Sequence, residues 1–161
     1  MAGPRETTLC YDDLRTGDAL PALDVPITAT VIVAGAIASR DYQDVHHDAL
    51  LARQRGSKDV FMNILTTNGF VGRYVTDWAG PEALLRSVDI RLGAPNYPGD
   101  TMRFSGTVTG MRDGIVTVAV RGANGLGDHV SGQVELALPR CAQAAEGGAQ
   151  RAAGERSRKK G

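Results

Sequence analysis

The hydrophobic pattern changes its period near residue 80, and this change constrains the fold more than any other feature of the chain. Upstream, apolar residues between Phe61 and Trp78 recur at intervals of three and four, which predicts one long helix ended by Gly80-Pro81. Downstream, apolar and polar residues alternate, which predicts half-buried strands over 88–92, 101–109, 115–121 and 130–138. We therefore expect an α+β fold in which an antiparallel sheet wraps around one long central helix.

Turn residues predict how these segments connect. Asp113-Gly114 is typical of a hairpin turn, and Asn124-Gly125 marks the next connection, so we expect the four strands to form an antiparallel meander. Ahead of the long helix, the sequence predicts a strand near Leu23–Ile27 and a short buried helix over Val31–Ala38. A further short helix is expected over Ala49–Gln54.

The long helix has its own signals. Ser57 or Asp59 is expected to cap its N-terminus, because a side-chain oxygen there can accept hydrogen bonds from the first-turn N–H groups. Gly69 and Gly72 lower helix propensity by about 1 kcal/mol each relative to alanine. We expect these two glycines to let the sheet wrap closely around the helix.

Length and charge divide the chain into a domain and two terminal segments. The 161 residues, of which 42% are hydrophobic and 22% charged, suit one soluble domain with a real core. The net charge is zero, but residues 139–161 carry six basic and two acidic side chains, which leaves an acidic body. That body has few aromatic residues and argues against nucleic-acid binding. We expect a flexible N-terminus over 1–12, the domain over 13–138 and a disordered basic tail over 139–161.

Two cysteines and the N-terminal residues bear on the compartment. Cys10 and Cys141 lie far apart in the sequence with no C-x-x-C motif, which argues against a disulfide scaffold or a zinc ribbon and suits a reducing cytoplasm. No secretory signal is seen, and the longest apolar run, Val31–Ala38, is too short to span a bilayer. The sequence predicts a cytoplasmic protein without membrane segments.

The densest group of chemically active side chains precedes the long helix. In the stretch RDYQDVHHD, Asp41 and His46 stand five residues apart. A carboxylate beside an imidazole can orient the ring or hold a water molecule, and histidine exchanges protons near neutral pH. The spacing alone is also compatible with a solvated or helix-capping cluster. Metal binding by His46, His47 and Asp48 is disfavoured, because adjacent histidines tend to point apart and no third ligand has fitting spacing.

The order of these features resembles a known family. Gly17-Asp18, the D-x₄-H-x-D stretch from Asp41 to Asp48, a central helix and antiparallel strands are similar to the MaoC-like (R)-specific enoyl-CoA hydratases, which have the hot-dog fold. The stretches ASRDYQDVHHD, GSKDVFMNIL and RYVTDWAGP most resemble the small subunit of the heteromeric enoyl-CoA hydratases of bacterial steroid side-chain degradation.

The resemblance implies a site and a reaction. Asp41 and His46 match the catalytic dyad of the family, with His46 as the base that activates water and Asp41 holding that water and returning a proton to the α-carbon. The resemblance leaves open which of the two residues makes each proton transfer. Backbone N–H groups near Phe61 to Asn63 would stabilise the enolate-like thioester oxygen. Substrate-binding residues are expected from two places, Arg40 beside the dyad and the start of the long helix: Phe61, Met62, Asn63 and Asn68. No cofactor and no metal are expected.

Partners and alternatives also follow from the resemblance. The substrate would be an acyl-CoA, and the chain would pair with a larger MaoC-like subunit in a heterodimer or heterotetramer, without nucleic acid or membrane. One alternative is a non-catalytic hot-dog subunit that binds acyl-CoA or scaffolds the larger chain. Another is a hot-dog thioesterase, which commonly uses an acidic residue on the long helix. Here Asp59 and Asp77 stand only at the ends of that helix.

Overall fold

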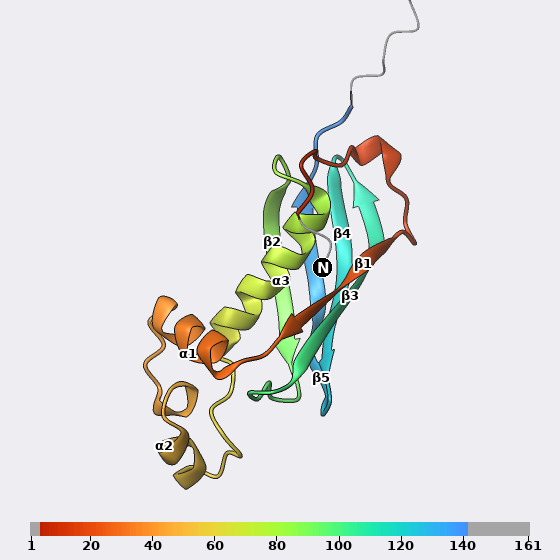
Figure 1. Cartoon of the computed structure of the whole chain (residues 1–161). Helices are drawn as coiled ribbons and strands as arrows, with labels where there is room; N and C mark the ends of the chain where they lie inside the picture. The colour runs from red at the N-terminus through yellow and green to blue at the C-terminus, as the bar shows by residue number, and fades with distance from the viewer. Residues whose placement is uncertain (1–3, 142–161) are drawn as a thin grey trace, which may run out of the picture.

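A five-stranded antiparallel sheet with one long helix across its face forms the body of the molecule (Figure 1). The computed structural model describes residues 4–141. The helix α3, Ile64–Ala79, turns Val71, Val75 and Trp78 into the core. Each such side chain contributes about 1.5–3 kcal/mol by leaving water. The α+β architecture with a central helix, expected from the change of period, is confirmed.

The sheet contains the strand expected near the N-terminus and the four expected after residue 80. Its strands are β1 (Ala19–Pro26), β2 (Leu84–Leu92), β3 (Thr101–Arg112), β4 (Ile115–Asn124) and β5 (Gly127–Ala137). Along β3, the buried residues are Met102, Phe104, Gly106 and Val108, and each residue that separates two of them is exposed. This alternation places one face of the sheet against α3 and the other outward.

The predicted meander is correct for three strands and wrong for the fourth. The order in the sheet is β1-β3-β4-β5-β2, so β2 pairs with β5 and β1 takes the place beside β3. The connection over 93–100 contains Pro95 and Pro98 and is too long for a tight hairpin, so β2 is free to lie at the opposite edge. The edge strand β2 is mostly exposed, including Leu84, Leu85 and Leu92.

Two short helices lie beyond the N-terminal end of α3 (Figure 1). They are α1 (Ala29–Ala38) and α2 (Ala49–Gln54), which confirms both predicted helices, and the 3₁₀ turn η2 (Asp44–His46) lies between them. Thr28 caps α1 by accepting from the amide of Val31, and Asp48 caps α2. The segment therefore folds locally and holds the Asp41–His46 region against the start of α3.

The predicted cap of the long helix is wrong. Asn63 is the N-cap, and neither Ser57 nor Asp59 reaches the first turn. The amide of Phe61 donates to the carbonyl of Val45, and the amide of Met62 donates to the carbonyl of Asn96. Hydrogen bonds to two other segments therefore hold residues 61 and 62 outside the helix, so the helix starts later in the sequence than the apolar pattern predicted.

The N-terminal segment is packed where the structure describes it. The amides of Arg5 and Leu9 donate to the carbonyls of Asp77 and Ala79 at the end of α3, at 3.0 and 2.8 Å. The flexible segment expected over 1–12 is thus hydrogen bonded from Arg5 onward, before the 3₁₀ turn η1 (Tyr11–Asp13). The disordered tail expected over 139–161 lies, from residue 142, outside the described residues.

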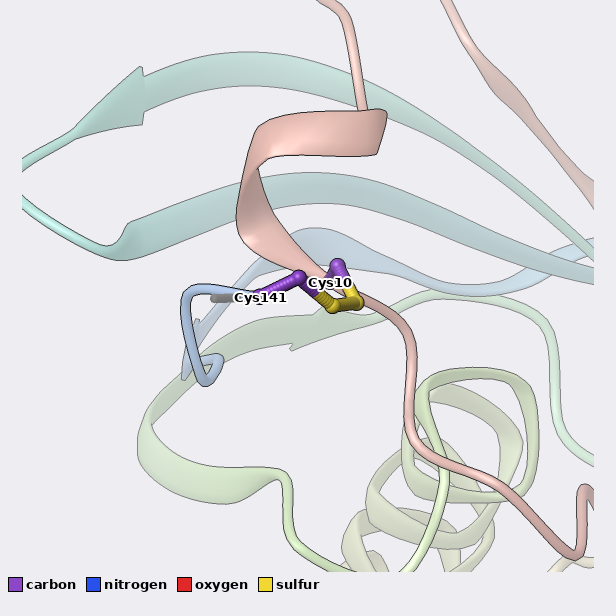
Figure 2. The surroundings of a disulfide bond; sticks show 2 residues. All are labelled: Cys10 and Cys141. Carbon is purple, nitrogen blue, oxygen red and sulfur yellow. A yellow bond between two sulfur atoms is a disulfide. The ribbon is translucent and has the colours of Figure 1, made fainter. Parts of the chain in front are cut away.

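A disulfide joins Cys10 to Cys141 (Figure 2), although the distance between these cysteines in the sequence had argued against a disulfide scaffold. Their Cα atoms are 5.5 Å apart across 131 positions of sequence. Packing of the N-terminal segment beside the end of β5 brings them together, since the amide of Tyr11 donates to the carbonyl of Pro139. Among residues 4–141, no helix is long and apolar enough to cross a membrane. The cytoplasmic location stays a prediction.

Candidate active site

The turn that ends α1 places Asp41. Arg40 adopts a left-handed conformation with φ of 57°, and the amide of Asp41 donates back to the carbonyl of Ala36 at 2.9 Å. A left-handed residue after a helix reverses the chain while satisfying the last carbonyls. Asp41 consequently leaves α1 pointing toward the N-terminus of α3 rather than into solvent.

The adjacent 3₁₀ turn buries His46 beside that carboxylate. The side chain is only 9% exposed, and its ring packs edge-on against Phe61, with centroids 4.9 Å apart. Its Nδ1 lies 2.7 Å from the Phe61 carbonyl, which can only accept, so Nδ1 carries the proton of the neutral ring. The other nitrogen, Nε2, then presents a lone pair to Asp41 Oδ2 at 3.5 Å. The predicted Asp41–His46 pair is brought together, with the histidine in one tautomer.

A buried amide links the pair to the long helix. Asn63, 2% exposed, donates from Nδ2 to Asp41 Oδ2 at 3.0 Å and to Ser39 Oγ at 2.9 Å. The hydrogen bond from Asn63 is the main cause that lowers the pKa of Asp41, opposed by burial and aided by the Gln43 amide and by His46. Asp41 is therefore a carboxylate at neutral pH, with an oxygen aimed at His46.

The amides expected to stabilise the thioester oxygen are partly occupied. Those of Phe61 and Met62 donate to Val45 and Asn96, so these two are unavailable, which corrects the expectation for them. Within residues 4–141, no acceptor is found for the amides of Asn63 and Ile64. A helix leaves its first N–H groups without intrahelical partners, and they favour negative charge. The free donors therefore begin at Asn63.

Two other predicted substrate-binding residues, Arg40 and Asn68, lie outside the hydrogen-bond network of Asp41 and His46. Arg40 is exposed and forms no ion pair within the part of the chain described. Asn68 lies one turn into α3 and is half-buried. Its side-chain amide makes no hydrogen bond to any residue from 4 to 141. Among the described residues, no hydrogen bond or ion pair joins the side chain of Arg40 or of Asn68 to Asp41 or His46.

Comparison with known proteins decides the family. The model of the MaoC-like domain matches residues 15–128. The chain belongs to the MaoC-like family. It is 56% identical to the 3-oxo-4,17-pregnadiene-20-carboxyl-CoA hydratase beta subunit of Mycobacterium tuberculosis, over 76% of this chain and 95% of that protein.

Solved structures agree with the MaoC-like assignment. A chain of the ChsH1-ChsH2 complex from Mycobacterium tuberculosis superposes with a TM-score of 0.76 at 55% identity, covering 77% of this chain and 98% of that one. An R-hydratase from Pseudomonas aeruginosa superposes with a TM-score of 0.75 at 22% identity, covering 86% and 93% of the two chains. The second likeness shows the fold alone, and the expected hot-dog architecture is confirmed.

The remaining polar residues of this MaoC-like segment have structural partners. Asp48 accepts from the amides of Leu50 and Leu51, so the capping alternative is correct for this residue. Asp44 pairs with Arg55 at 2.6 Å. Among residues 4–141, the one group close enough to share a metal ion is Cys10, Asp13 and Cys141. The two sulfurs there are bonded to each other, so neither offers a thiolate.

A second buried histidine fastens the helix to the sheet. His129 donates from Nδ1 to the Ala94 carbonyl at 2.7 Å, and its Nε2 accepts from Thr67 Oγ1 at 2.9 Å. Burial lowers the pKa of His129, so the ring is neutral. Because both nitrogens are occupied inside the core, this histidine joins α3 to β5 and has no free atom for catalysis.

An open apolar groove of about 430 Å³ runs between α1 and α3 and begins at Ser39, the residue that shares the Asn63 amide with Asp41. A side chain at Gly69 would meet no atom within 4 Å, whereas one at Gly72 would approach Leu85. Gly72 therefore faces β2 as expected, and Gly69 faces the groove rather than the sheet. The groove is lined by Gly35, Ala38, Ser39, Leu65, Thr66, Gly69, Phe70 and Arg73.

Proposed function

We propose that this chain is the catalytic subunit of an enoyl-CoA hydratase, which adds water across the α,β double bond of a steroid side-chain enoyl-CoA. The observation that carries the proposal is the pair of acceptors, His46 Nε2 and Asp41 Oδ2, that face each other at 3.5 Å in a mostly buried site. The name of the 56% identical protein, a pregnadiene carboxyl-CoA hydratase subunit, supports the substrate class.

Two facing acceptors need a shared donor. With the proton on Nδ1, Nε2 has a lone pair, and the Asp41 carboxylate offers another. A water molecule supplies two O–H groups, one for each acceptor. Held in this way, its oxygen lone pairs point away from the dyad, toward a substrate.

The proton balance then follows. The water oxygen bonds to the β-carbon while His46 Nε2 takes one of its protons, and the π electrons move toward the thioester carbonyl. Protonated His46 returns that proton to the α-carbon, so one H₂O is added in total. Asp41, with its lowered pKa, keeps the remaining O–H as an acceptor and stabilises the charged imidazole.

Backbone amides complete the site. As the enolate forms, negative charge develops on the thioester oxygen. We assign its stabilisation to the amides of Asn63 and Ile64 at the N-terminus of α3. Arg40, Phe61 and Asn68 remain proposed substrate contacts, Phe61 through its side chain because its amide is occupied. Met62 is 2% exposed and packs in the core, and its amide is also occupied, so the structure does not support the expected substrate contact there.

A larger MaoC-like subunit is the proposed partner, in a heterodimer or heterotetramer. Strand β2 has β5 on one side and a free edge on the other, and Leu84, Leu85 and Leu92 are each more than 40% exposed. Exposed apolar edges are usually covered. The similar solved structure is a ChsH1-ChsH2 complex, which agrees with a two-protein assembly.

The function is tested by activity of the assembled complex. The chain is co-expressed with the proposed partner, a larger MaoC-like protein, and the purified complex is given a steroid side-chain enoyl-CoA. We expect loss of the enoyl-thioester absorbance and a product heavier by one water in mass spectrometry. Hydration of short enoyl-CoAs alone would remove the steroid assignment. Absence of hydration with every enoyl-CoA, or release of free CoA, would overturn the hydratase proposal.

The groove supplies a prediction on substrate size. We assign the bulky acyl group to the groove between α1 and α3, because it is apolar and begins beside the dyad. A Gly69→Leu substitution fills open space, so the fold should hold. We expect KM for the steroid enoyl-CoA to rise about tenfold or more, with little change for crotonyl-CoA, because one isobutyl group blocks only the larger ligand.

The matched control is Gly69→Ala, whose single methyl group leaves most of the groove open. Size-exclusion chromatography checks assembly of both variants. Equal loss of activity toward both substrates, or failure of Gly69→Leu to assemble with its partner, would assign the groove to the subunit interface instead.

A further inference from the structure

We propose that Asn63 is a positioning residue for the dyad: its side-chain amide fixes the rotation of the Asp41 carboxylate and so the place of the water held between Asp41 and His46. This inference rests on the proposed function. It also changes the assignment made from the sequence, where Asn63 was expected to bind substrate.

The orientation of this amide is determined by its partners. Asn63 Oδ1 accepts from the backbone amide of Thr66 at 2.9 Å, and only the oxygen of the side chain can accept. The –NH₂ group must then face the other way, where both of its hydrogens find acceptors, Asp41 Oδ2 at 3.0 Å and Ser39 Oγ at 2.9 Å. Every polar atom of this buried side chain is occupied, so it has none free for a ligand.

These bonds join three backbone elements at one point. Ser39 closes α1 by donating to the carbonyl of Gly35 at 2.7 Å, and Asn63 itself caps α3. Between them, Asp41 is held at one oxygen by Asn63 and at the other by the amide of Gln43 at 3.4 Å. A carboxylate with a donor at each oxygen cannot rotate freely. The lone pair that faces His46 Nε2 is consequently fixed in direction.

Few charged groups face Asp41 from the elements around it. His46, from η2, lies opposite at 3.5 Å. The first turn of α3 carries no acidic residue. From the neighbouring turns, Arg40 is exposed and Asp44 is paired with Arg55. A change in the titration of Asp41 on replacing Asn63 would therefore report the lost amide.

The decisive variant is Asn63→Asp in the assembled complex. Aspartate keeps the size of the side chain and its capping oxygen, so α3 still starts correctly. It replaces the donor to Asp41 with a second carboxylate, and like charges in contact raise a carboxyl pKa. We expect the acidic limb of the kcat/KM profile to move up by about one to two pH units, and kcat at neutral pH to fall about 10- to 100-fold.

A second variant keeps the test valid if Asn63→Asp fails to fold. Asn63→Ser retains a capping oxygen but is too short to reach Asp41, and it adds no charge. We expect a smaller upward shift of the same acidic limb, with assembly intact. The matched control is Thr28→Ala, which removes the N-cap of a different helix, α1, and leaves the hydrogen bonds of Asn63 and Asp41 in place. Its pH profile should coincide with that of the wild type.

The readout separates this inference from the proposed function. Titration of the Asp41 carboxyl carbon by ¹³C NMR, in the complex with and without the substitutions, follows the carboxylate without turnover. An inactive wild type would overturn the hydratase proposal. Even then, a shift in the titration midpoint of Asp41 in both Asn63→Asp and Asn63→Ser would support the proposal that Asn63 positions the carboxylate. Unmoved titration and pH profiles in both folded variants would overturn the role of Asn63.

Discussion

Replacing His46 with alanine in the assembled complex is expected to lower kcat for enoyl-CoA hydration by about 10²- to 10⁴-fold. Among the described residues, His46 Nε2 is the only basic nitrogen that faces Asp41. Its lone pair is available because the proton of the neutral ring is on Nδ1, which donates to the Phe61 carbonyl. Removing the ring takes away the group that accepts the proton of water. The helix amides and substrate positioning remain, so some activity should survive. Initial rates at saturating substrate measure the loss.

The neighbouring histidine provides the matched control. His47 is exposed and its Nε2 lies 3.1 Å from the Tyr42 carbonyl, away from the dyad, so His47→Ala should retain wild-type activity. Asp41→Asn should lose activity to a degree similar to His46→Ala, because asparagine has an –NH₂ group in place of one of the two carboxylate oxygens that accept hydrogen bonds. Full activity of an assembled His46→Ala complex would assign the chemistry to the partner, and this chain would then be the non-catalytic subunit.

Loss of the Cys10–Cys141 disulfide is expected to lower the free energy of unfolding by roughly 3–5 kcal/mol. The bond closes a loop across 131 positions of sequence, and the entropy removed from the unfolded chain grows with the length of such a loop. The corresponding fall in melting temperature is about 10–20 °C. Thermal unfolding of the complex, at fixed protein concentration, compares the wild type with Cys10→Ser/Cys141→Ser.

Reductant supplies the control for this measurement. Dithiothreitol should lower the melting temperature of the wild type to that of the double variant and leave the double variant unchanged. Mass spectrometry without reduction should find the wild type two hydrogens lighter than its free-thiol form. Two free thiols in protein purified without reductant would contradict the pairing.

Features that depend on local sequence were predicted well. The alternation in 101–109 and 115–121 reports which face of a strand is buried, and β3 and β4 extend over both stretches. Asp41 and His46 were selected because their types and spacing match a family motif, and the structure brings them together. Their catalytic role remains a proposal.

Features set by distant contacts were not predicted. The carbonyls of Asn96 and Val45 accept from the amides of Met62 and Phe61, and the apolar spacing around residue 61 does not indicate that the helix begins only after Asn63. The position of β2 beside β5 depends on β1 occupying the other edge. The Asn63 contact with Asp41 spans two helices, although an asparagine just before an apolar helical run is itself a capping signal.

The 5.5 Å separation of the Cys10 and Cys141 Cα atoms means that the domain begins and ends at nearly the same point (Figure 2). A short peptide could therefore replace the sulfur bridge and join the two ends directly, with new termini opened elsewhere. The exposed turn at Asp113-Gly114 between β3 and β4 lies away from Asp41 and His46 in the chain and suits such an opening. A circular permutant cut there would keep every strand pairing while freeing the original ends from any need for an oxidising compartment.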